Sequence, residues 1–292
     1  MNRILIDGSY IAYANIFSTY SAVFNNQQFG PNFTPTDNED FCEKLSEKYF
    51  GNLEYITRTI KESLQNTDTN SQECEAILVL DCKKTTNHRL RIFPDYKKQR
   101  IDATPPFNIG AAFNFLRHNF IQSGRMKAML DIDWLSVDQA EGDDIIAVLV
   151  HSFPTDNNII IAKDKDFVQL TDSARLFDHR LNEMTTQSIM EKHNIATPIT
   201  PSQYLTLKII LGDGADNIPQ VKKGLGFKRA INLITDKTAM DTFLAESPPD
   251  VLERIRLNRE LIDMTRIPDD IKLNVLKSYL TLKKTNAEVN TL

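Results

Sequence analysis

Three short runs of apolar residues along the chain have the pattern of strands that are buried in a parallel sheet. They are RILI at 3–6, AILVL at 76–80 and IIIA at 159–162, and polar or turn-forming residues bound each of them. Runs that are apolar at every position are typical of strands covered on both faces. The pattern therefore predicts at least three strands of a central, mainly parallel sheet.

Helical periodicity fills the intervals between these runs. Residues 40–65 carry apolar side chains close to a 3.6-residue period, and Gly142 to Phe153 reads as a second helix. The acids of this second helix lie in its first turn, where they complement the helix dipole. Strands that alternate with helices predict an α/β fold, which binds its ligands at the carboxyl ends of the strands.

The remaining segments suggest two regions. Asn25 to Asp40 is polar and rich in turn residues, which predicts a loop, and residues 95–130 lack a strand signal. After Pro198 the pattern is helical with short loops. We therefore expect an α/β core over 1–198 and a helical region over 199–292.

Composition excludes several classes of protein. The 292 residues are 41% hydrophobic and 25% charged, as in ordinary globular proteins, and no apolar run approaches the length of a membrane span. The N-terminus lacks a signal-peptide pattern, and the three cysteines lack metal-ligand spacing. The five histidines are scattered, so zinc is not expected. These features predict a cytoplasmic protein without a membrane partner.

Nine carboxylates form the main candidate for chemistry. They fall in five clusters, nearly all at the end of an apolar run or the start of a helix: Asp7; Asp81; Glu141, Asp143 and Asp144; Asp164 and Asp166; Asp213 and Asp216. Acids massed at one edge of a sheet repel one another, and hard divalent cations such as Mg²⁺ are the expected compensation. Two such ions held by carboxylates activate water and stabilise the transition state of phosphodiester hydrolysis. For any single Asp after a strand, a turn or cap role is the commoner explanation.

Basic residues concentrate at 83–100 and 222–229, although the net charge is −5. Lys97 and Arg100 have the reach to contact a scissile phosphate. Gly224 and Gly226 would let backbone N–H groups approach a phosphate at a helix N-terminus. For both basic runs, a solvated charged face remains the alternative.

The ordered motifs IDGSY, LVLD, FPDYKKQR, QAEGDDIIA, AKDKDF and LGDGADNIP resemble the structure-specific 5′ nuclease family. That family includes flap endonucleases, phage 5′-3′ exonucleases and the 5′ nuclease domain of DNA polymerase I. The resemblance spans almost the whole chain and implies a PIN-like 5′ nuclease core. It also implies a helical arch at about 98–130 and a DNA-binding helix–hairpin–helix at about 203–235.

The resemblance assigns roles to individual residues. One Mg²⁺ or Mn²⁺ ion is expected mainly at Asp7, Asp81, Glu141 and Asp143, and a second at Asp164, Asp166 and Asp213, with Asp144 and Asp216 in support. Lys97 and Arg100 match a catalytic basic pair, and Tyr13 matches an aromatic that stacks on a base; an alternative role for Tyr13 is packing inside the first helix. The other expected nucleic-acid contacts are Tyr96, Lys98, Arg117, Lys222, Lys223, Gly224, Gly226, Lys228 and Arg229. Several family members bind K⁺ at the hairpin turn, where this chain has Gln220 in place of the usual glycine and one extra residue.

The expected function is metal-dependent 5′-3′ exonuclease or flap endonuclease activity on branched DNA and RNA–DNA hybrids, as in RNA primer removal during replication. Expected partners are the nucleic acid and replication proteins such as a single-strand-binding protein. A monomer of phage origin, located in the host cytoplasm, is anticipated. Two alternatives stay open, a non-catalytic branched-nucleic-acid-binding scaffold and a PIN-type ribonuclease. The basic turn at 220–229 counts against the ribonuclease.

Overall fold

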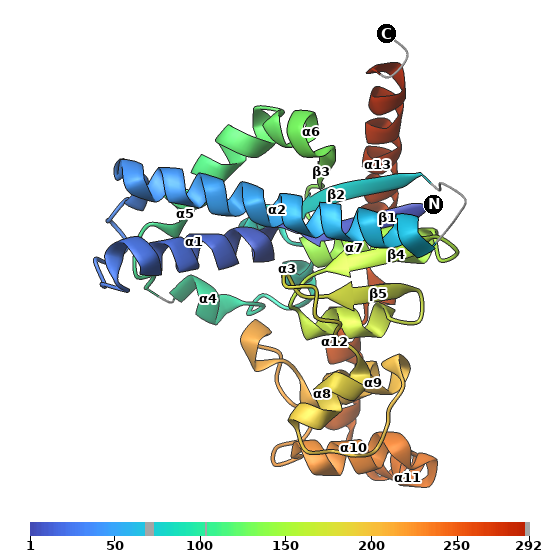
Figure 1. Ribbon diagram of the computed structural model, residues 1–292. Coiled ribbons are helices and arrows are strands. Elements are labelled where there is room, and N and C mark those ends of the chain that lie inside the picture. Colours follow the sequence, from blue (N-terminus) through green and yellow to red (C-terminus); the bar gives the residue numbers. More distant parts are fainter. Residues whose placement is uncertain (68–72, 103, 290–292) are drawn as a thin grey trace.

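A five-stranded parallel sheet lies at the centre of the computed structural model, which describes residues 1–67, 73–102 and 104–289 (Figure 1). The strand order is β3-β2-β1-β4-β5. The strands are β1 (Asn2–Asp7), β2 (Cys74–Leu80), β3 (Ile132–Ser136), β4 (Asn157–Ile161) and β5 (Ala174–Phe177). The three strands expected from the apolar runs are confirmed as β1, β2 and β4, within two residues at each end.

The two edge strands β3 and β5 were not anticipated from the sequence. Both are short, and polar or exposed positions interrupt their apolar residues, as at Trp134, which is 38% exposed. An edge strand has a sheet neighbour on one side only, so its sequence lacks the continuous apolar run of a central strand.

Helices cover both faces of the sheet. On one face lie α1 (Gly8–Phe24) and α2 (Glu39–Thr67), which pack on Ile4 and Ile6 of β1. On the other face α7 (Gly142–Ser152) packs around Leu5, and α13 (Asp269–Val289) lies against α7. The predicted helices at 40–65 and 142–153 are confirmed as α2 and α7.

The segment expected to form an arch is helical in several pieces: α4 (Lys98–Asp102), α5 (Ile109–Leu116), the π-helical η3 (Arg117–Gln122) and α6 (Arg125–Leu130). Its residues Phe107 and Phe120 are buried against α1 and α2. The expected loop at 25–40 holds the turn η1 (Pro35–Asp37). Because α2 begins at Glu39, the loop ends two residues earlier than expected. Two backbone hydrogen bonds, from the Gly30 N–H to the Pro106 carbonyl and from the Asn108 N–H to the Phe33 carbonyl, join the loop to this segment.

The helical pattern expected after Pro198 is confirmed. The remaining helices are α3 (Arg89–Ile92), α8 (Thr186–Lys192), α9 (Pro201–Leu211), α10 (Phe227–Thr235), α11 (Lys237–Glu246) and α12 (Pro249–Ile262), with 3-10 turns η2 (Lys84–Thr86), η4 (Lys165–Leu170), η5 (Gly214–Asp216) and η6 (Met264–Arg266). Within the described ranges, no helix has the length and apolar character needed to cross a membrane. One hydrophobic core runs from Leu5 to Tyr279, so it is continuous across residue 198.

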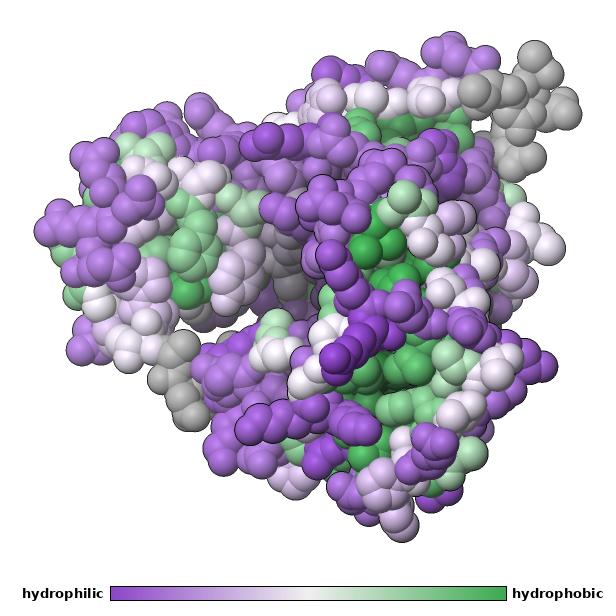
Figure 2. Space-filling model, turned by 90° about the horizontal axis from the view of Figure 1, so that it is seen from below, coloured by the Kyte–Doolittle hydropathy of each residue, from purple (hydrophilic) through white to green (hydrophobic). Residues whose placement is uncertain are grey.

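The helices around the sheet give the molecule an uneven outline. α1, α2 and α5 extend to the left beyond the sheet in Figure 1, whereas α10 and α11 lie below it. Seen from below, a recess separates this left-hand lobe from the rest of the molecule, whose surface has a hydrophobic area surrounded by hydrophilic residues (Figure 2).

Candidate metal centre

Three aspartates lie where parallel strands end. Asp7 is the last residue of β1 and caps α1 by accepting a 2.9 Å hydrogen bond from the Tyr10 N–H. Asp81 directly follows β2, and Asp164 follows β4 and caps η4. Because all the strands are parallel, their carboxyl ends meet at one edge of the sheet. Gly8 permits this approach, since a Cβ there would lie 2.7 Å from the Val79 carbonyl oxygen.

These three carboxylates have no cation within 4 Å in the part of the chain that the structure describes. Asp81 accepts hydrogen bonds from the Ser9 hydroxyl (2.6 Å) and from the Gly142 N–H (2.7 Å) instead. Burial, with the charges of Asp81 and Asp164, raises the pKa of Asp7 to about 7. Mutual repulsion of this kind makes the edge a ready binding place for a divalent ion, which would favour the charged form of every acid.

The N-terminus of α7 adds three more acids, Glu141, Asp143 and Asp144, whose ligand atoms lie within 4.8 Å of one another. Their electrostatic environments differ. Burial raises the pKa of Asp143 well above its ordinary value. Burial also opposes ionisation of Glu141, but the nearby Lys97 and Arg89 outweigh it and lower the pKa of that carboxyl.

Asp144 is fully buried and lies inside an ion-pair network. Arg89 Nη2 lies 2.8 Å from Asp144 Oδ1, and His88 Nε2 lies 3.2 Å from Asp144 Oδ2. The same Oδ2 accepts a hydrogen bond from the Glu141 N–H, which completes the capping box of α7. Both carboxylate oxygens of Asp144, which is expected in a supporting position, thus have partners within the protein. We therefore assign Asp144 to positioning Glu141.

The sequence reasoning missed Arg89 as an individual residue. Its side chain is buried, and it also contacts Glu141 at 3.1 Å and the Leu261 carbonyl at 3.0 Å. In the sequence it is one of seven basic residues in a run, and nothing there distinguishes it from the exposed Arg91.

The basic pair expected to contact phosphate lies beside the acids. Lys97 Nζ is 2.5 Å from Glu141 Oε1, and the Lys97 backbone has a left-handed φ of 55° that is held by a hydrogen bond from its N–H to the Asp216 carbonyl. Arg100 Nη2 lies 2.5 Å from Asp216 Oδ1 and is half exposed. Asp216 therefore pairs with two basic side chains, Arg100 and, at 3.8 Å, Lys97.

Tyr96 requires a correction. It was expected to contact nucleic acid, but it is only 4% exposed. Its hydroxyl donates to Glu141 Oε2 at 2.8 Å and lies 3.2 Å from Asp216 Oδ2. The burial leaves no face for a base, and Tyr96 instead holds two carboxylates in place.

A second residue that the sequence did not single out joins the last two acid pairs. Lys208 Nζ on α9 lies 2.8 Å from Asp166 Oδ1 and 2.5 Å from Asp213 Oδ2. Burial and the Asp164 charge raise the pKa of Asp166 to about 6, whereas Lys208 outweighs burial and lowers the pKa of Asp213. Six of the nine acids thus contact Arg89, Lys97, Arg100 or Lys208. Divalent ions are therefore not the sole compensation for the repulsion.

The other predicted contacts lie on the surface. Tyr13 on α1 is 42% exposed, with its ring stacked on Phe17 and edge-on to Phe113. The remaining predicted contacts apart from Tyr96 are also exposed: Lys98, Arg117, Lys222, Lys223, Gly224, Gly226, Lys228 and Arg229. Gly224 has a φ of 79°, and Gly226 is the N-cap of α10, so the expected glycine turn does precede a helix.

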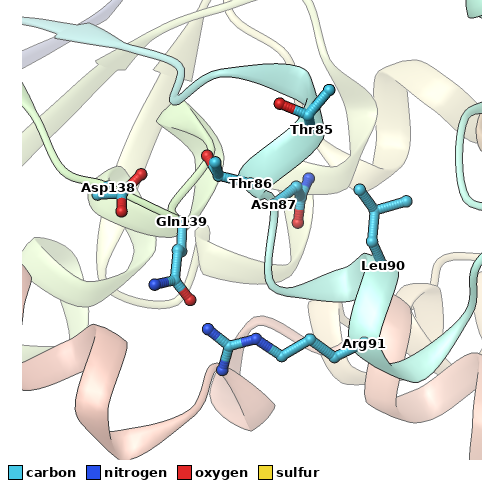
Figure 3. Close-up of a pocket in the computed structure, with 7 residues that line it drawn as sticks. All are labelled: Thr85, Thr86, Asn87, Leu90, Arg91, Asp138 and Gln139. Atoms are coloured by element: carbon cyan, nitrogen blue, oxygen red, sulfur yellow. The ribbon is translucent and has the colours of Figure 1, made fainter.

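The structure also has a pocket of about 380 Å³ beside the short helix α3. Its lining residues are Thr85, Thr86, Asn87, Leu90, Arg91, Asp138 and Gln139 (Figure 3). Arg91 and Gln139 point toward each other across it, and none of the nine acids lines it.

The parallel sheet, the acids at its carboxyl edge and the basic side chains among them define a carboxylate-centred nuclease of the α/β class. A family model described as the 5′-3′ exonuclease N-terminal resolvase-like domain matches residues 2–195, and the chain belongs to this 5′-3′ exonuclease family. It is therefore a nuclease, and its expected class of activity is confirmed.

Some of the similar proteins match nearly the whole chain. A 5′-3′ exonuclease of Buchnera aphidicola is 26% identical, covering 97% of this chain and 91% of its own length. DNA polymerase I of Streptococcus pneumoniae is 31% identical over 56% of this chain, which spans 18% of that larger protein. Among solved structures, a variant of the bacteriophage T5 flap endonuclease in complex with DNA and metal ions has a TM-score of 0.64 at 19% identity, covering 97% of this chain and 100% of that one. That structural similarity confirms the expected fold.

Proposed function

We propose that this chain hydrolyses phosphodiester bonds at the 5′ ends of branched DNA with the help of bound Mg²⁺ or Mn²⁺. The supporting observation is the set of three carboxylates Asp7, Asp81 and Asp164, which converge at one edge of the sheet with no cation beside them in the described ranges. Hard oxygen donors at this edge fit Mg²⁺ or Mn²⁺ better than a softer metal.

The donor set fits two ions. Asp7 and Asp81 with Glu141 and Asp143 would hold one ion, and Asp164 with Asp166 and Asp213 would hold a second. Bound divalent ions would supply an activated water and a sink for the charge that develops on the phosphate. This chain's own residues would hold those ions, while Lys97 and Arg100 add fixed positive charge beside them.

The surface around the acids suits a nucleic-acid strand. Tyr13 offers an exposed aromatic face in the second turn of α1, and stacking of a base on such a face contributes roughly 1–3 kcal/mol. Lys98 and Arg117 lie on the helical segment 98–130, whose helix α5 belongs to the left-hand lobe of Figure 1. The recess beside this lobe in Figure 2 is a candidate path for a single strand.

The basic turn before α10 would hold the duplex through its backbone. Lys222, Lys223, Lys228 and Arg229 are exposed around a glycine turn, which supports sequence-independent contacts to phosphates. Within this proposal, residues 203–235 act as a helix–hairpin–helix of a C-terminal region at 199–292. The same proposal includes a K⁺ ion at the turn, RNA–DNA hybrids as substrates, a role in primer removal, a single-strand-binding partner and a monomeric state.

The experiment that tests the proposal is a product map on 5′-labelled flap, nicked and RNA-primed substrates with Mg²⁺ and with excess chelator. Cleavage that requires the metal and starts at the 5′ end or the branch supports it. Mononucleotide products indicate trimming from the end, and a single longer fragment indicates cutting at the branch. Metal-independent cleavage, or cleavage of unbranched single-stranded RNA alone, contradicts it.

A further inference from the structure

Lys208 occupies the space between two acid pairs that come from different parts of the chain. Its ammonium nitrogen lies 2.8 Å from Asp166 Oδ1 at the start of η4 and 2.5 Å from Asp213 Oδ2 beyond the end of α9. The three side chains are only 17–20% exposed, so water screens the pair of contacts weakly. The lysine therefore neutralises the very carboxylates that a second ion would need.

An ammonium group and a divalent ion cannot both bridge Asp166 Oδ1 and Asp213 Oδ2. Mg²⁺ binds carboxylate oxygens at about 2.0–2.1 Å, and the nitrogen of Lys208 is already within 2.8 Å of both. Placing an ion there requires the lysine side chain to leave, and the binding free energy of the ion is reduced by the loss of two ion pairs.

The other half of the acid cluster differs in this respect. Glu141 is paired with Lys97 at 2.5 Å, but Asp7 and Asp81 have no cation within 4 Å among the residues described by the structure, and Asp143 meets Arg89 only at 3.9 Å. An ion can bind Asp7, Asp81 and Asp143 without displacing a basic side chain that bridges them. The two halves of the cluster are thus unequal for a reason that lies in this chain alone.

We infer that Lys208 competes with the second divalent ion, so that the Asp166–Asp213 side of the centre binds metal only when the lysine moves away. The inference rests on the proposed function and deepens it. It makes Lys208 a residue that sets the relative affinity of the two ions, beyond its contribution to the stability of the fold.

The test is calorimetric titration with Mn²⁺ on the full chain, because it reads ion uptake without reference to cleavage. The wild type is expected to bind one ion tightly and a second more weakly. Lys208→Met removes the charge and keeps the length of the side chain. We expect it to tighten the weaker ion about tenfold or more and to leave the tighter one within about twofold. Lys208→Arg keeps the charge and is expected to retain weak binding.

Lys127→Met is the matched control for ion uptake. Lys127 also bridges two aspartates, with Nζ 2.7 Å from Asp131 and 3.0 Å from Asp133, but neither belongs to the acid cluster. Its substitution is expected to leave both Mn²⁺ affinities unchanged. If Lys208→Met does not fold by circular dichroism, Lys208→Gln carries the same test.

Thermal unfolding gives an independent reading. Without metal, Lys208→Met leaves Asp166 and Asp213 unpaired, so we expect a lower Tm and a larger rise in Tm on addition of Mn²⁺ than in the wild type. Unchanged or weaker uptake of the second ion by Lys208→Met overturns the inference. If the wild type still binds Mn²⁺ and cleaves, the proposed function survives that result. If the wild type neither binds Mn²⁺ nor cleaves with it, both fail.

Discussion

The guanidinium of Arg89 lies 2.8 Å from the carboxylate of Asp144, although both side chains are buried. The pair joins the short helix α3 to the N-terminus of α7, which carries three acids of the candidate centre. Asp144 in turn accepts the Glu141 N–H, so the position of a candidate ligand depends on an ion pair behind it.

Arg89→Met is expected to lower the free energy of unfolding by about 3–5 kcal/mol, because it leaves the Asp144 charge buried without its main partner. Urea titration of the purified protein measures this loss. Arg91→Met is the control, since Arg91 is exposed and reaches Asp270 only at 4.0 Å. Its effect should stay within about 0.5 kcal/mol. Equal effects of the two substitutions would show that the buried pair adds nothing to the free energy of unfolding.

Asp81→Asn is expected to reduce cleavage by about 10³-fold or more, since one charged ligand is lost and each 1.4 kcal/mol of transition-state stabilisation is worth about tenfold. The amide oxygen can still accept the hydrogen bond from the Gly142 N–H, and the amide NH2 can donate to the Ser9 hydroxyl, so the fold should be retained. Single-turnover cleavage of a flap substrate measures the rate, and binding in Ca²⁺ measures affinity. Asp138→Asn, on an exposed acid outside the cluster, should cleave at the wild-type rate.

Asp7 has a pKa of about 7 in the folded protein and an ordinary value of 3.8. The folded state therefore holds this proton more tightly than the unfolded state, and the resulting stabilisation is complete below pH 3.8 and is lost as the pH rises through about 7. Asp7→Asn removes this charge and keeps the N-cap of α1.

At pH 8 and without metal, we expect Asp7→Asn to have a free energy of unfolding about 1–3 kcal/mol larger than that of the wild type. The variant should no longer cleave. The difference should shrink as the pH falls toward 4. Thermal melts in chelator between pH 4 and 8 provide the measurement. A variant that is less stable than the wild type at pH 8 would contradict the electrostatic reading of this edge.

Tyr13→Ala is expected to weaken binding of a single-stranded 5′ flap by about 1–3 kcal/mol, because it removes an exposed ring on which a base can stack. Fluorescence anisotropy with a labelled flap in Ca²⁺ measures the change. Tyr55→Ala is the matched control, since Tyr55 is 45% exposed and belongs to α2 rather than to the segments that carry the nine acids. If both variants bind alike, Tyr13 serves only to pack against Phe17 and Phe113.

The apolar runs predicted β1, β2 and β4, because a strand covered on both faces must be apolar at every position. The same argument could not find β3 and β5, since an edge strand is bounded by solvent as well as by the core. Likewise, the acids could be assigned to strand ends and to the first turn of α7 from the chain alone, because those positions follow from local patterns.

The sequence by itself determined the parallel α/β core, the gathering of acids at its edge and the family to which the motifs belong. Only the tertiary structure decided which acids have a basic side chain beside them. Arg89 and Lys208 lie 55 residues before Asp144 and 42 residues after Asp166 along the chain, so no local pattern relates Arg89 to Asp144 or Lys208 to Asp166. The tertiary structure likewise decided that Tyr96 is buried and Tyr13 is exposed, because the exposure of a tyrosine depends on the helices that fold over it.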